Sequence, residues 1–419
     1  MAENPPDPPA EHPSLSAATL KERLDAGDSV RLLDVRDRDE FESWHIDGPT
    51  VTATQLPFAK FLQAKVTGDV DGLLDDVAGE GPITAVCARG EASAFVAGLL
   101  VDHGVDARNL ADGMEGWARL YDAHELPTDA ATVLQYERPA SGCLSYLVVS
   151  DGEAAVVDPL RAFSDRYVAD AAARDATLRY AVDTHVHADH LSGIRQLASG
   201  HGAEPVVPAP AVDRGITFDV TVLPGDGSLA VGSATLEAIP LPGHTTGMTG
   251  FRVGDTLLSG DSIFLESVAR PDLEAGDDGA PDLARTLYET LTERLAKLPD
   301  ETVVAPGHRS ETTDPAEDDT YTARLGELRD RLPALALDRE SFVERLCGDI
   351  PPRPANFERI VAINLGTDAA DDDTAFELEL GPNNCAAAPL RTATCCGVCR
   401  VATRPRRSSP APPRPRRAG

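Results

Sequence analysis

One short run of residues constrains this chain more than any other. Residues 184–191 read Thr-His-Val-His-Ala-Asp-His-Leu, which places three imidazoles and one carboxylate within six positions. His185 and His187 are two apart and so share one side of an extended segment, whereas Asp189 and His190 follow as the chain turns into a helix. The run predicts a strand that ends in a turn where several polar side chains converge.

Three later segments repeat the design of a strand followed by a tight turn and one ligand-type side chain. His244 lies in Pro-Gly-His-Thr-Thr-Gly, Asp261 ends Ser-Gly-Asp, and His308 ends Pro-Gly-His. Neutral imidazoles and carboxylates are the ligands that zinc, iron and manganese take. Any one of these residues alone could be a solvated loop residue. The set, in this order at predicted strand ends, predicts a metal site.

The chain from about residue 132 to His308 resembles the metallo-β-lactamase superfamily on these motifs. The resemblance implies an αββα sandwich that holds one or two metals between its sheets. In the glyoxalase II-like branch two zinc ions share the whole set, with a bridging hydroxide as nucleophile. That branch would add four ligands to the first three, namely His187, Asp189, His190 and His308.

The persulfide dioxygenase branch carries the same motif but binds one iron. The resemblance to it implies that Fe(II) is held by His185, His244 and Asp261. Such a two-His-one-carboxylate facial triad leaves three positions open for a thiolate sulfur and O₂. Residues 270–273, 351–356 and 362–366 resemble this branch, but Arg309 and Ser310 replace the Asp-Tyr that many members have after the last histidine.

Arg270 is a candidate substrate-binding residue in the segment after the metal aspartate. By resemblance it would bind an acidic thiol carrier, because an anionic substrate in so acidic a chain needs local positive charge. The alternative is a structural ion pair with Asp272. Both interpretations stay open at this point.

A second constellation surrounds Cys87, which starts the run Cys-Ala-Arg-Gly-Glu-Ala-Ser between a predicted strand at 83–87 and a predicted helix at 92–103. A loop that curls at a helix N-terminus points backbone N–H groups inward and favours a thiolate and its persulfide. The alternative is a buried structural cysteine. The context of the loop decides between them.

That context resembles a single rhodanese domain over about residues 14–121. Four segments carry the resemblance, namely residues 32–36, 44–48, 87–93 and 109–117. It implies that Cys87 carries sulfane sulfur and that Arg89, with the loop amides, stabilises it. Glu91 and Asp112 depart from the usual pattern, so an active sulfurtransferase stands beside an inactive regulatory copy as the alternative.

The expected fold is therefore an N-terminal rhodanese-like α/β domain followed by an αββα metallo-β-lactamase sandwich. The expected divisions are a disordered segment 1–13, the rhodanese-like domain 14–121, a linker 122–131, the metallo-β-lactamase-fold domain with its extension 132–382, and a disordered Arg/Pro-rich tail 383–419. Apolar runs at 143–150 and 154–157, split by Asp151-Gly152, predict a hairpin.

The tail breaks the composition of the chain. From Gly381 onward it has eight arginines and no acidic residue. A basic arm, a disordered appendage and out-of-frame coding sequence would each produce this switch, and we favour the last two together. Cys395, Cys396 and Cys399 have CxxC spacing, but without a second pair nearby this is a weak zinc signal.

The net charge of −31, with only four lysines, predicts a halophilic, salt-adapted surface and argues against nucleic-acid binding. No stretch has the length and apolar character of a membrane span, and the first residues do not read as a secretory signal. We therefore expect a cytoplasmic protein. The seven cysteines do not form a disulfide framework.

Both halves of the chain would handle sulfane sulfur if the dioxygenase branch is right. The hypothesis is a persulfide dioxygenase that oxidises a low-molecular-weight thiol persulfide with O₂ to sulfite, using one Fe(II) per chain, fused to a rhodanese sulfurtransferase. The first alternative is a glyoxalase II-like thioester hydrolase with two Zn(II). The second is a non-enzymatic sulfur carrier. The oligomeric state stays open, with a homodimer as one candidate.

Overall fold

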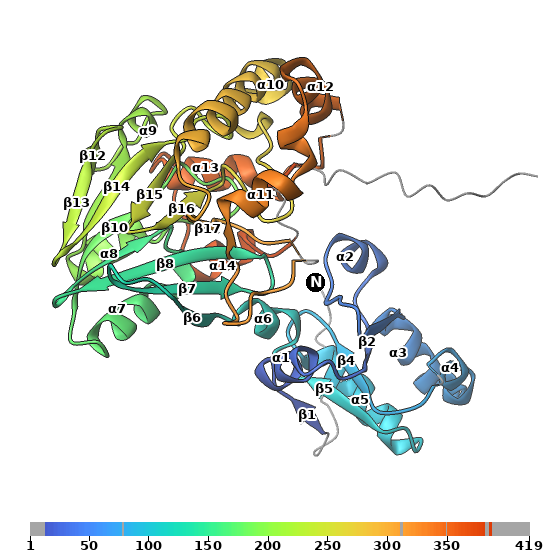
Figure 1. The fold of residues 1–419 in the computed structure, drawn as a ribbon. Coiled ribbons are helices and arrows are strands. Elements are labelled where there is room, and N and C mark those ends of the chain that lie inside the picture. The colour runs from blue at the N-terminus through green and yellow to red at the C-terminus, as the bar shows by residue number, and fades with distance from the viewer. Residues whose placement is uncertain (1–12, 78, 311–312, 349, 382–384, 388–419) are drawn as a thin grey trace, which may run out of the picture.

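The computed structural model describes residues 13–77, 79–310, 313–348, 350–381 and 385–387, and two domains follow one another along the chain (Figure 1). The first is built on a five-stranded sheet in the order β1-β5-β4-β2-β3, and every strand pair in it is parallel. Its elements are β1 (Ser14–Leu15), α1 (Ala17–Asp25), β2 (Val30–Asp34), α2 (Arg38–Ser43), β3 (Val51–Gln55), α3 (Phe58–Thr67), α4 (Val70–Asp76), β4 (Ile83–Val86), α5 (Glu91–Asp102), β5 (Ala107–Leu110) and α6 (Gly113–Ala118).

Both faces of this parallel sheet are buried, which explains the continuous apolar run of β2. Leu33 packs in one core cluster with α3 and α5, whereas Val30 and Leu32 pack in another with α1 and α6. Parallel sheets carry helices on both faces for this reason. The arrangement confirms the α/β domain expected at the N-terminal side.

The second domain has two sheets, of seven strands in the order β12-β11-β10-β9-β8-β7-β6 and of six strands in the order β13-β14-β15-β16-β17-β18. The strands are β6 (Asp122–Leu126), β7 (Thr132–Arg138), β8 (Cys143–Ser150), β9 (Glu153–Val157), β10 (Thr177–Val182), β11 (Glu204–Pro208), β12 (Thr221–Leu223), β13 (Ser228–Val231), β14 (Ala234–Pro240), β15 (Thr249–Val253), β16 (Thr256–Gly260), β17 (Val303–Pro306) and β18 (Ala323–Arg324). The helices are α7 (Ser164–Ala172), α8 (Ile194–His201), α9 (Ala209–Asp213), α10 (Asp272–Glu289), α11 (Leu325–Arg331), α12 (Arg339–Gly348), α13 (Phe357–Asn364) and α14 (Asp372–Leu378).

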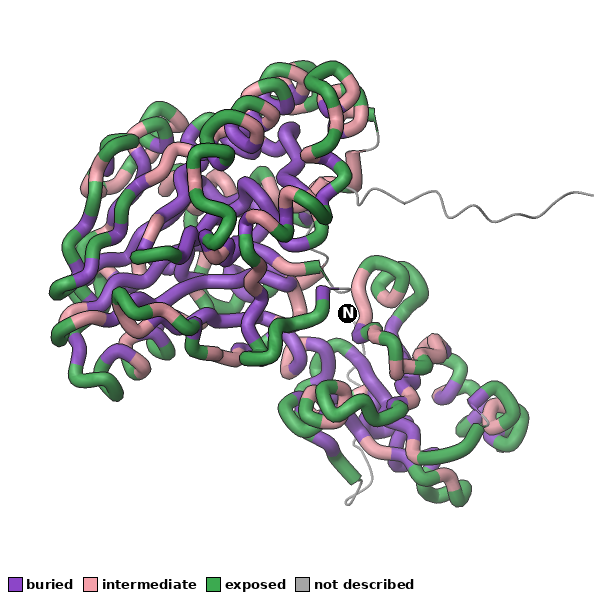
Figure 2. The backbone as a smooth tube through the Cα atoms, in the orientation of Figure 1, coloured by how far each residue is buried: buried purple, intermediate pink, exposed green. Residues whose placement is uncertain are grey.

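Strand β8 shows how the layers pack. Leu144, Tyr146 and Val148 lie in the core cluster that also holds residues of the second sheet, whereas Leu147 and Val149 lie in the cluster that holds residues of α7 and α8. Side chains alternate between the two faces of a strand, so β8 is covered on both sides. The result is the expected αββα sandwich, and Figure 2 shows the buried backbone concentrated in its strands.

The predicted hairpin is confirmed. β8 and β9 pair antiparallel up to Ser150 and Glu153, and the two residues between them, Asp151 and Gly152, have φ of 44° and 81°. Two central residues with positive φ form the turn whose twist matches that of the flanking strands.

The expected linker at 122–131 is wrong in its first half. Residues 122–126 form β6, which pairs antiparallel with β7 from Asp122↔Glu137 to Leu126↔Val133. Leu126 is 3% exposed and belongs to the core between the sheets. Burial of this one apolar side chain and a free edge on β7 explain why a polar segment becomes a strand.

The expected disordered tail is also wrong at its start. Ala386 forms an isolated bridge with Ala269, and Ala387 N–H donates to Val268 O at 2.9 Å. Cys385 is 2% exposed. Small apolar side chains let this short segment lie against a buried strand-like stretch. The remainder of the tail, including Cys395, Cys396 and Cys399, and residues 1–12 lie outside the described residues.

None of the helices within the described ranges has the length and apolar character needed to cross a bilayer.

Candidate metal centre and sulfur-transfer loop

Three of the predicted ligands meet at one edge of the sandwich. His185 follows β10, His244 lies in the turn between β14 and β15, and Asp261 directly follows β16. Each is 1% exposed, and one ligand atom from each lies within 4.8 Å of the others. Asp261 Oδ2 is 3.8 Å from the Nε2 atom of each histidine. The structure thus brings together the triad that the resemblance implied.

The outer hydrogen bonds set the tautomer of both histidines. The Thr184 hydroxyl donates to Asp158 Oδ2 at 2.9 Å, so at 2.9 Å it accepts from His185 Nδ1–H. His244 Nδ1–H donates to the carbonyl oxygen of Arg270 at 2.8 Å. With the proton held on Nδ1, each Nε2 keeps a lone pair.

Burial lowers the pKa of His185 well below its usual value and lowers that of His244 as well, so both rings are neutral. Burial alone would raise the pKa of Asp261, but the contacts with His308 outweigh it and hold the carboxyl ionised. Neutral imidazole and ionised carboxylate are the forms that bind a metal.

Two atoms of this triad are buried without any hydrogen-bond partner, namely His185 Nε2 and Asp261 Oδ2. Buried polar atoms are nearly always paired, so each such atom needs an explanation. A cation between two imidazole lone pairs and a carboxylate satisfies both atoms. The residues therefore fit a metal ion.

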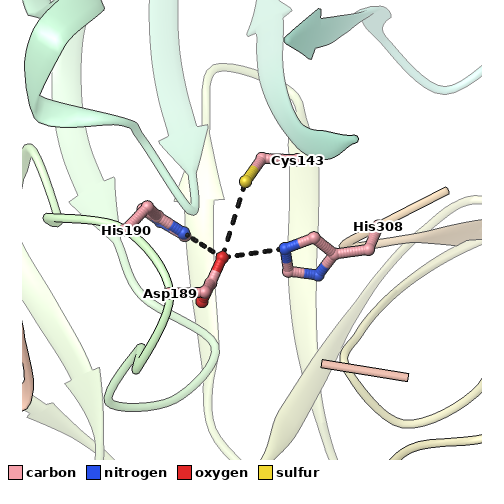
Figure 3. A group of neighbouring side chains, drawn as sticks. All are labelled: Cys143, Asp189, His190 and His308. Atoms are coloured by element: carbon pink, nitrogen blue, oxygen red, sulfur yellow. Dashed lines mark hydrogen bonds and ion pairs between the residues drawn. The ribbon is translucent and has the colours of Figure 1, made fainter. Parts of the chain in front are cut away.

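A neighbouring set is arranged differently (Figure 3). His308 lies between two carboxylates: its Nδ1 is 2.7 Å from Asp261 Oδ1 and its Nε2 is 2.9 Å from Asp189 Oδ2. Burial would lower the pKa of His308, but Asp261 and Asp189 raise it well above its usual value. Both ring nitrogens therefore donate, and neither offers a lone pair.

Asp189 Oδ2 also accepts from His190 Nδ1 at 3.0 Å and from the Cys143 thiol at 3.5 Å, so three groups converge on one oxygen (Figure 3). Burial would raise the pKa of Cys143, but the charge of His308 lowers it to about 7. His190 Nε2 is buried without a hydrogen bond. These four side chains could hold a second ion, since one ligand atom from each lies within 4.8 Å of the rest.

His187 belongs to a third group, with Asp158 and Asp183, although its ring centroid is only 4.2 Å from that of His185. Its Nε2 is 3.1 Å from Asp158 Oδ1, and Asp183 Oδ1 is 3.9 Å away. The chain bends after His185, so spacing by two does not carry the two imidazoles to the same partners.

Sequence reasoning missed Asp158, Cys143 and Cys385 at this centre. Asp158 directly follows β9, so a carboxylate after a buried strand at the same edge was an available signal. Cys143 is the first residue of the buried strand β8 and has no metal-type spacing to another cysteine or histidine. Cys385 lies with Asp189, Asp261 and His308 within 4.8 Å, and its distance along the chain gave no signal.

The Arg270 side chain makes the ion pair that was the alternative to substrate binding. Its Nε and Nη2 donate to the two oxygens of Asp272 at 2.8 and 3.0 Å, and its other donors reach the carbonyls of Pro351 and Pro352. The guanidinium is 1% exposed, which favours the structural ion pair, and substrate binding by Arg270 stays a prediction. Its backbone carbonyl orients His244 instead.

In the N-terminal domain the Cys87 sulfur accepts two hydrogen bonds. Gly90 N–H and the Ser93 hydroxyl each lie 3.1 Å from Sγ, at the start of α5. The same hydroxyl is 2.7 Å from Asn109 Oδ1 on β5, and because it has a single proton, the sulfur and this oxygen are alternative acceptors. Donors at a helix N-terminus stabilise a thiolate, so the loop has the cradle that its sequence predicted, with Ser93 and Asn109 as additional members.

Arg89 was expected to stabilise sulfur on Cys87, but among the described residues it makes no hydrogen bond to that sulfur. Its guanidinium pairs with Glu115 and with Glu377 of α14, and its side chain is 58% exposed. The charge of this exposed guanidinium is screened by solvent and by its two carboxylate partners. Gly90 and Ser93 contact the sulfur directly.

Gly113→Ala is expected to disrupt the sulfur-transfer loop. Gly113 has φ of 56°, and a Cβ there would lie 2.2 Å from Cys87 O, an impossible contact with backbone. The loop must shift, which we expect to cost about 2–4 kcal/mol of stability in this domain and most sulfur transfer. Thermal unfolding and a sulfurtransferase assay check this, with Gly104→Ala, whose Cβ meets nothing within 4 Å, as the positive-φ control. Wild-type transfer by Gly113→Ala would contradict the described loop.

Each half of the chain matches a known protein family. The metallo-beta-lactamase superfamily model matches residues 138–308, and the rhodanese-like domain model matches residues 16–120. Human mitochondrial persulfide dioxygenase ETHE1 is 29% identical over 245 residues, which is 55% of this chain and 86% of that protein. A hydroxyacylglutathione hydrolase from Rhodobacter capsulatus is 33% identical over 220 residues, 52% of this chain and 78% of that protein.

Among solved structures, that of ETHE1 from Myxococcus xanthus is similar with a TM-score of 0.49 and 25% identity, covering 59% of this chain and 100% of that one.

Proposed function

Because the chain belongs to the metallo-beta-lactamase superfamily and carries a rhodanese-like domain before it, we propose that it is a persulfide dioxygenase fused to a sulfurtransferase. The reaction consumes a low-molecular-weight thiol persulfide, O₂ and water and yields the free thiol, sulfite and two protons. The outer sulfur of the persulfide is oxidised and O₂ is reduced. The S–S bond breaks, and the thiol is the leaving group.

One observation carries this proposal over the alternative. His185 and His244 each turn Nδ1 to an outer acceptor and Nε2 toward Asp261, whereas the two ring nitrogens of His308 lie 2.7 and 2.9 Å from carboxylate oxygens of Asp261 and Asp189. This pattern favours one metal at the triad. Fe(II) bound by two imidazoles and a carboxylate supplies open coordination positions for a thiolate sulfur and O₂.

The chain's own residues orient that centre. Thr184 and the Arg270 carbonyl fix the two imidazole tautomers, and His308 holds Asp261 by its second oxygen. The surroundings are nearly dry, since every triad residue is 1% exposed. Cys87, cradled by Gly90 and Ser93, would accept or deliver sulfane sulfur in the first domain.

The test loads metal-free protein with Fe(II) under argon and measures metal content, then O₂ uptake with glutathione persulfide. We expect about one iron per chain, persulfide-dependent O₂ consumption, and sulfite formed in equal amount. Protein that binds two zinc ions, cleaves a hydroxyacylglutathione thioester and consumes no O₂ would overturn the proposal.

That second outcome is the competing function, and one observation favours it. His190 Nε2 is buried without a hydrogen bond, and one ligand atom each of Cys143, Asp189, His190 and His308 lies within 4.8 Å of the others. A second ion could bind there if His308 lost a proton. Similarity to a hydroxyacylglutathione hydrolase supports a thioester hydrolase with two zinc ions as the second candidate function.

A further inference from the structure

A buried ion pair of the second domain also contacts the first domain. Arg138 is the last residue of β7, and Glu379 directly follows α14. Arg138 Nη1 donates to Glu379 Oε2 at 2.6 Å, with side chains only 1% and 2% exposed. Arg138 Nε donates at 3.0 Å to the carbonyl of Ala118, the last residue of α6. The pair therefore reaches from the second domain into the first.

The other oxygen of this carboxylate holds the metal-binding loop. Glu379 Oε1 accepts from the backbone N–H of Leu191 at 2.7 Å. Leu191 directly follows His190 and ends the run 184–191 that carries four ligand-type side chains. One carboxylate thus connects that loop to the arginine that contacts the N-terminal domain.

Asn364 of α13 holds the same loop without reaching the first domain. Its Nδ2 donates to the carbonyls of His187 and His190 at 3.0 and 2.9 Å, and its Oδ1 accepts from Ser192 N–H at 2.9 Å. Two side chains from the C-terminal extension therefore fix the loop backbone. Of these two, Glu379 is the one whose contacts continue into the rhodanese-like domain through Arg138.

Stability alone does not explain why this pair is ionic. Arg138 Nη2 is buried without a hydrogen-bond partner, so the site leaves one charged donor unsatisfied. Apolar residues of similar volume often serve as well as or better than a buried ion pair. Directional bonds at both ends, to Ala118 O and Leu191 N–H, point to a geometric role.

We propose that Arg138 and Glu379 are positioning residues that couple docking of the rhodanese-like domain to the shape of the metal-binding loop. The affinity of the centre for its metal then depends on the interface between the domains. The inference rests on the metal centre of the proposed function, and it does not depend on which reaction that centre performs.

The experiment titrates the metal-free full chain with Co²⁺ and follows its visible absorption, which reports both affinity and ligand geometry. Arg138→Met removes the contact with Ala118 O. Glu379→Gln leaves one acceptor where Leu191 N–H and Arg138 Nη1 both need one. We expect each variant to raise the Kd for Co²⁺ by about 10–100-fold, the usual effect of losing a partner outside the ligand set, and to shift the absorption bands.

Glu377→Gln is the matched control, because Glu377 lies on α14 two residues before Glu379 and pairs with Arg89 of the first domain. Its partner is the exposed Arg89, its own side chain is 55% exposed, and among the described residues it makes no hydrogen bond or ion pair with the loop at 184–191. Its Kd should stay within about twofold of wild type, since exposed pairs contribute little. An equal loss of affinity in Glu377→Gln would overturn the assignment to Arg138 and Glu379.

The double variant Arg138→Met/Glu379→Gln shows whether the two residues act as one unit. If they do, the Kd of the double variant for Co²⁺ equals that of the single variant that binds Co²⁺ less tightly. If its fold increase in Kd instead equals the two single fold increases multiplied together, the residues act independently and the coupling is overturned. The double variant also leaves no unpaired charge buried, so it supplies the measurement if Arg138→Met does not fold. A folded variant with wild-type Kd and spectrum overturns the proposal. If the wild-type protein binds iron fully but consumes no O₂ with the persulfide, only the proposed function is overturned.

Discussion

Asp261→Asn is expected to abolish both iron binding and O₂ uptake. The substitution removes the one anionic ligand of the triad, and its amide cannot serve both the metal and His308 as the carboxylate does. Partners outside the ligand set are worth about 10–100-fold in affinity or activity, so losing a ligand should cost more than 100-fold. Metal content, O₂ consumption and thermal unfolding measure the outcome.

Asp189→Asn is the matched control for this substitution. It changes an equally buried carboxylate that contacts His308 and His190 but lies outside the triad. We expect this variant to keep about one iron per chain. If it loses metal as completely as Asp261→Asn does, a single ion at the triad is the wrong description and the dinuclear centre gains support.

Cys87→Ser is expected to eliminate sulfur transfer while O₂ uptake stays within about twofold of wild type. The serine oxygen can accept the bonds of Gly90 and Ser93, so the loop keeps its shape, but it cannot form a persulfide. Transfer is measured from glutathione persulfide to cyanide, and O₂ uptake is measured on the iron-loaded protein.

Two further variants sharpen this result. Ser93→Ala removes one of the two donors to Cys87 Sγ and should lower transfer by about tenfold, since a charge-assisted hydrogen bond contributes about 1.5 kcal/mol or more. Cys347→Ser changes a half-buried cysteine on α12 and should alter neither activity. Residual transfer in Cys87→Ser equal to that of Cys347→Ser would show that another cysteine carries the sulfur.

Local features of the sequence predicted much of the fold. The hairpin at residues 151–152 needs only two turn residues between apolar runs, and β2 and β4 need only short apolar stretches. The ligand motifs could be placed because each lies at the end of its own strand. Such features depend on neighbours along the chain, so one sequence is enough to find them.

The partners of those ligands could not be predicted, because they come from distant segments. Glu379 meets Leu191, Cys385 lies beside Asp261, and Arg270 turns away from the centre toward Asp272. No spacing rule relates these residues; three-dimensional packing brings them together. The predicted linker was wrong for the same reason. The free edge of β7 determines that Asp122–Leu126 pairs as a strand.

The contact between Leu191 and Glu379 also has a consequence for how the protein is made. These residues are 188 positions apart, and a ribosome adds about 5–20 residues per second. The loop with its histidines is therefore synthesised roughly 10–40 s before the glutamate that holds it. Until then the newly made loop is exposed to whichever cations the cell offers. If the centre selects its metal, that selection must wait for the last part of the chain, or the early occupant must exchange.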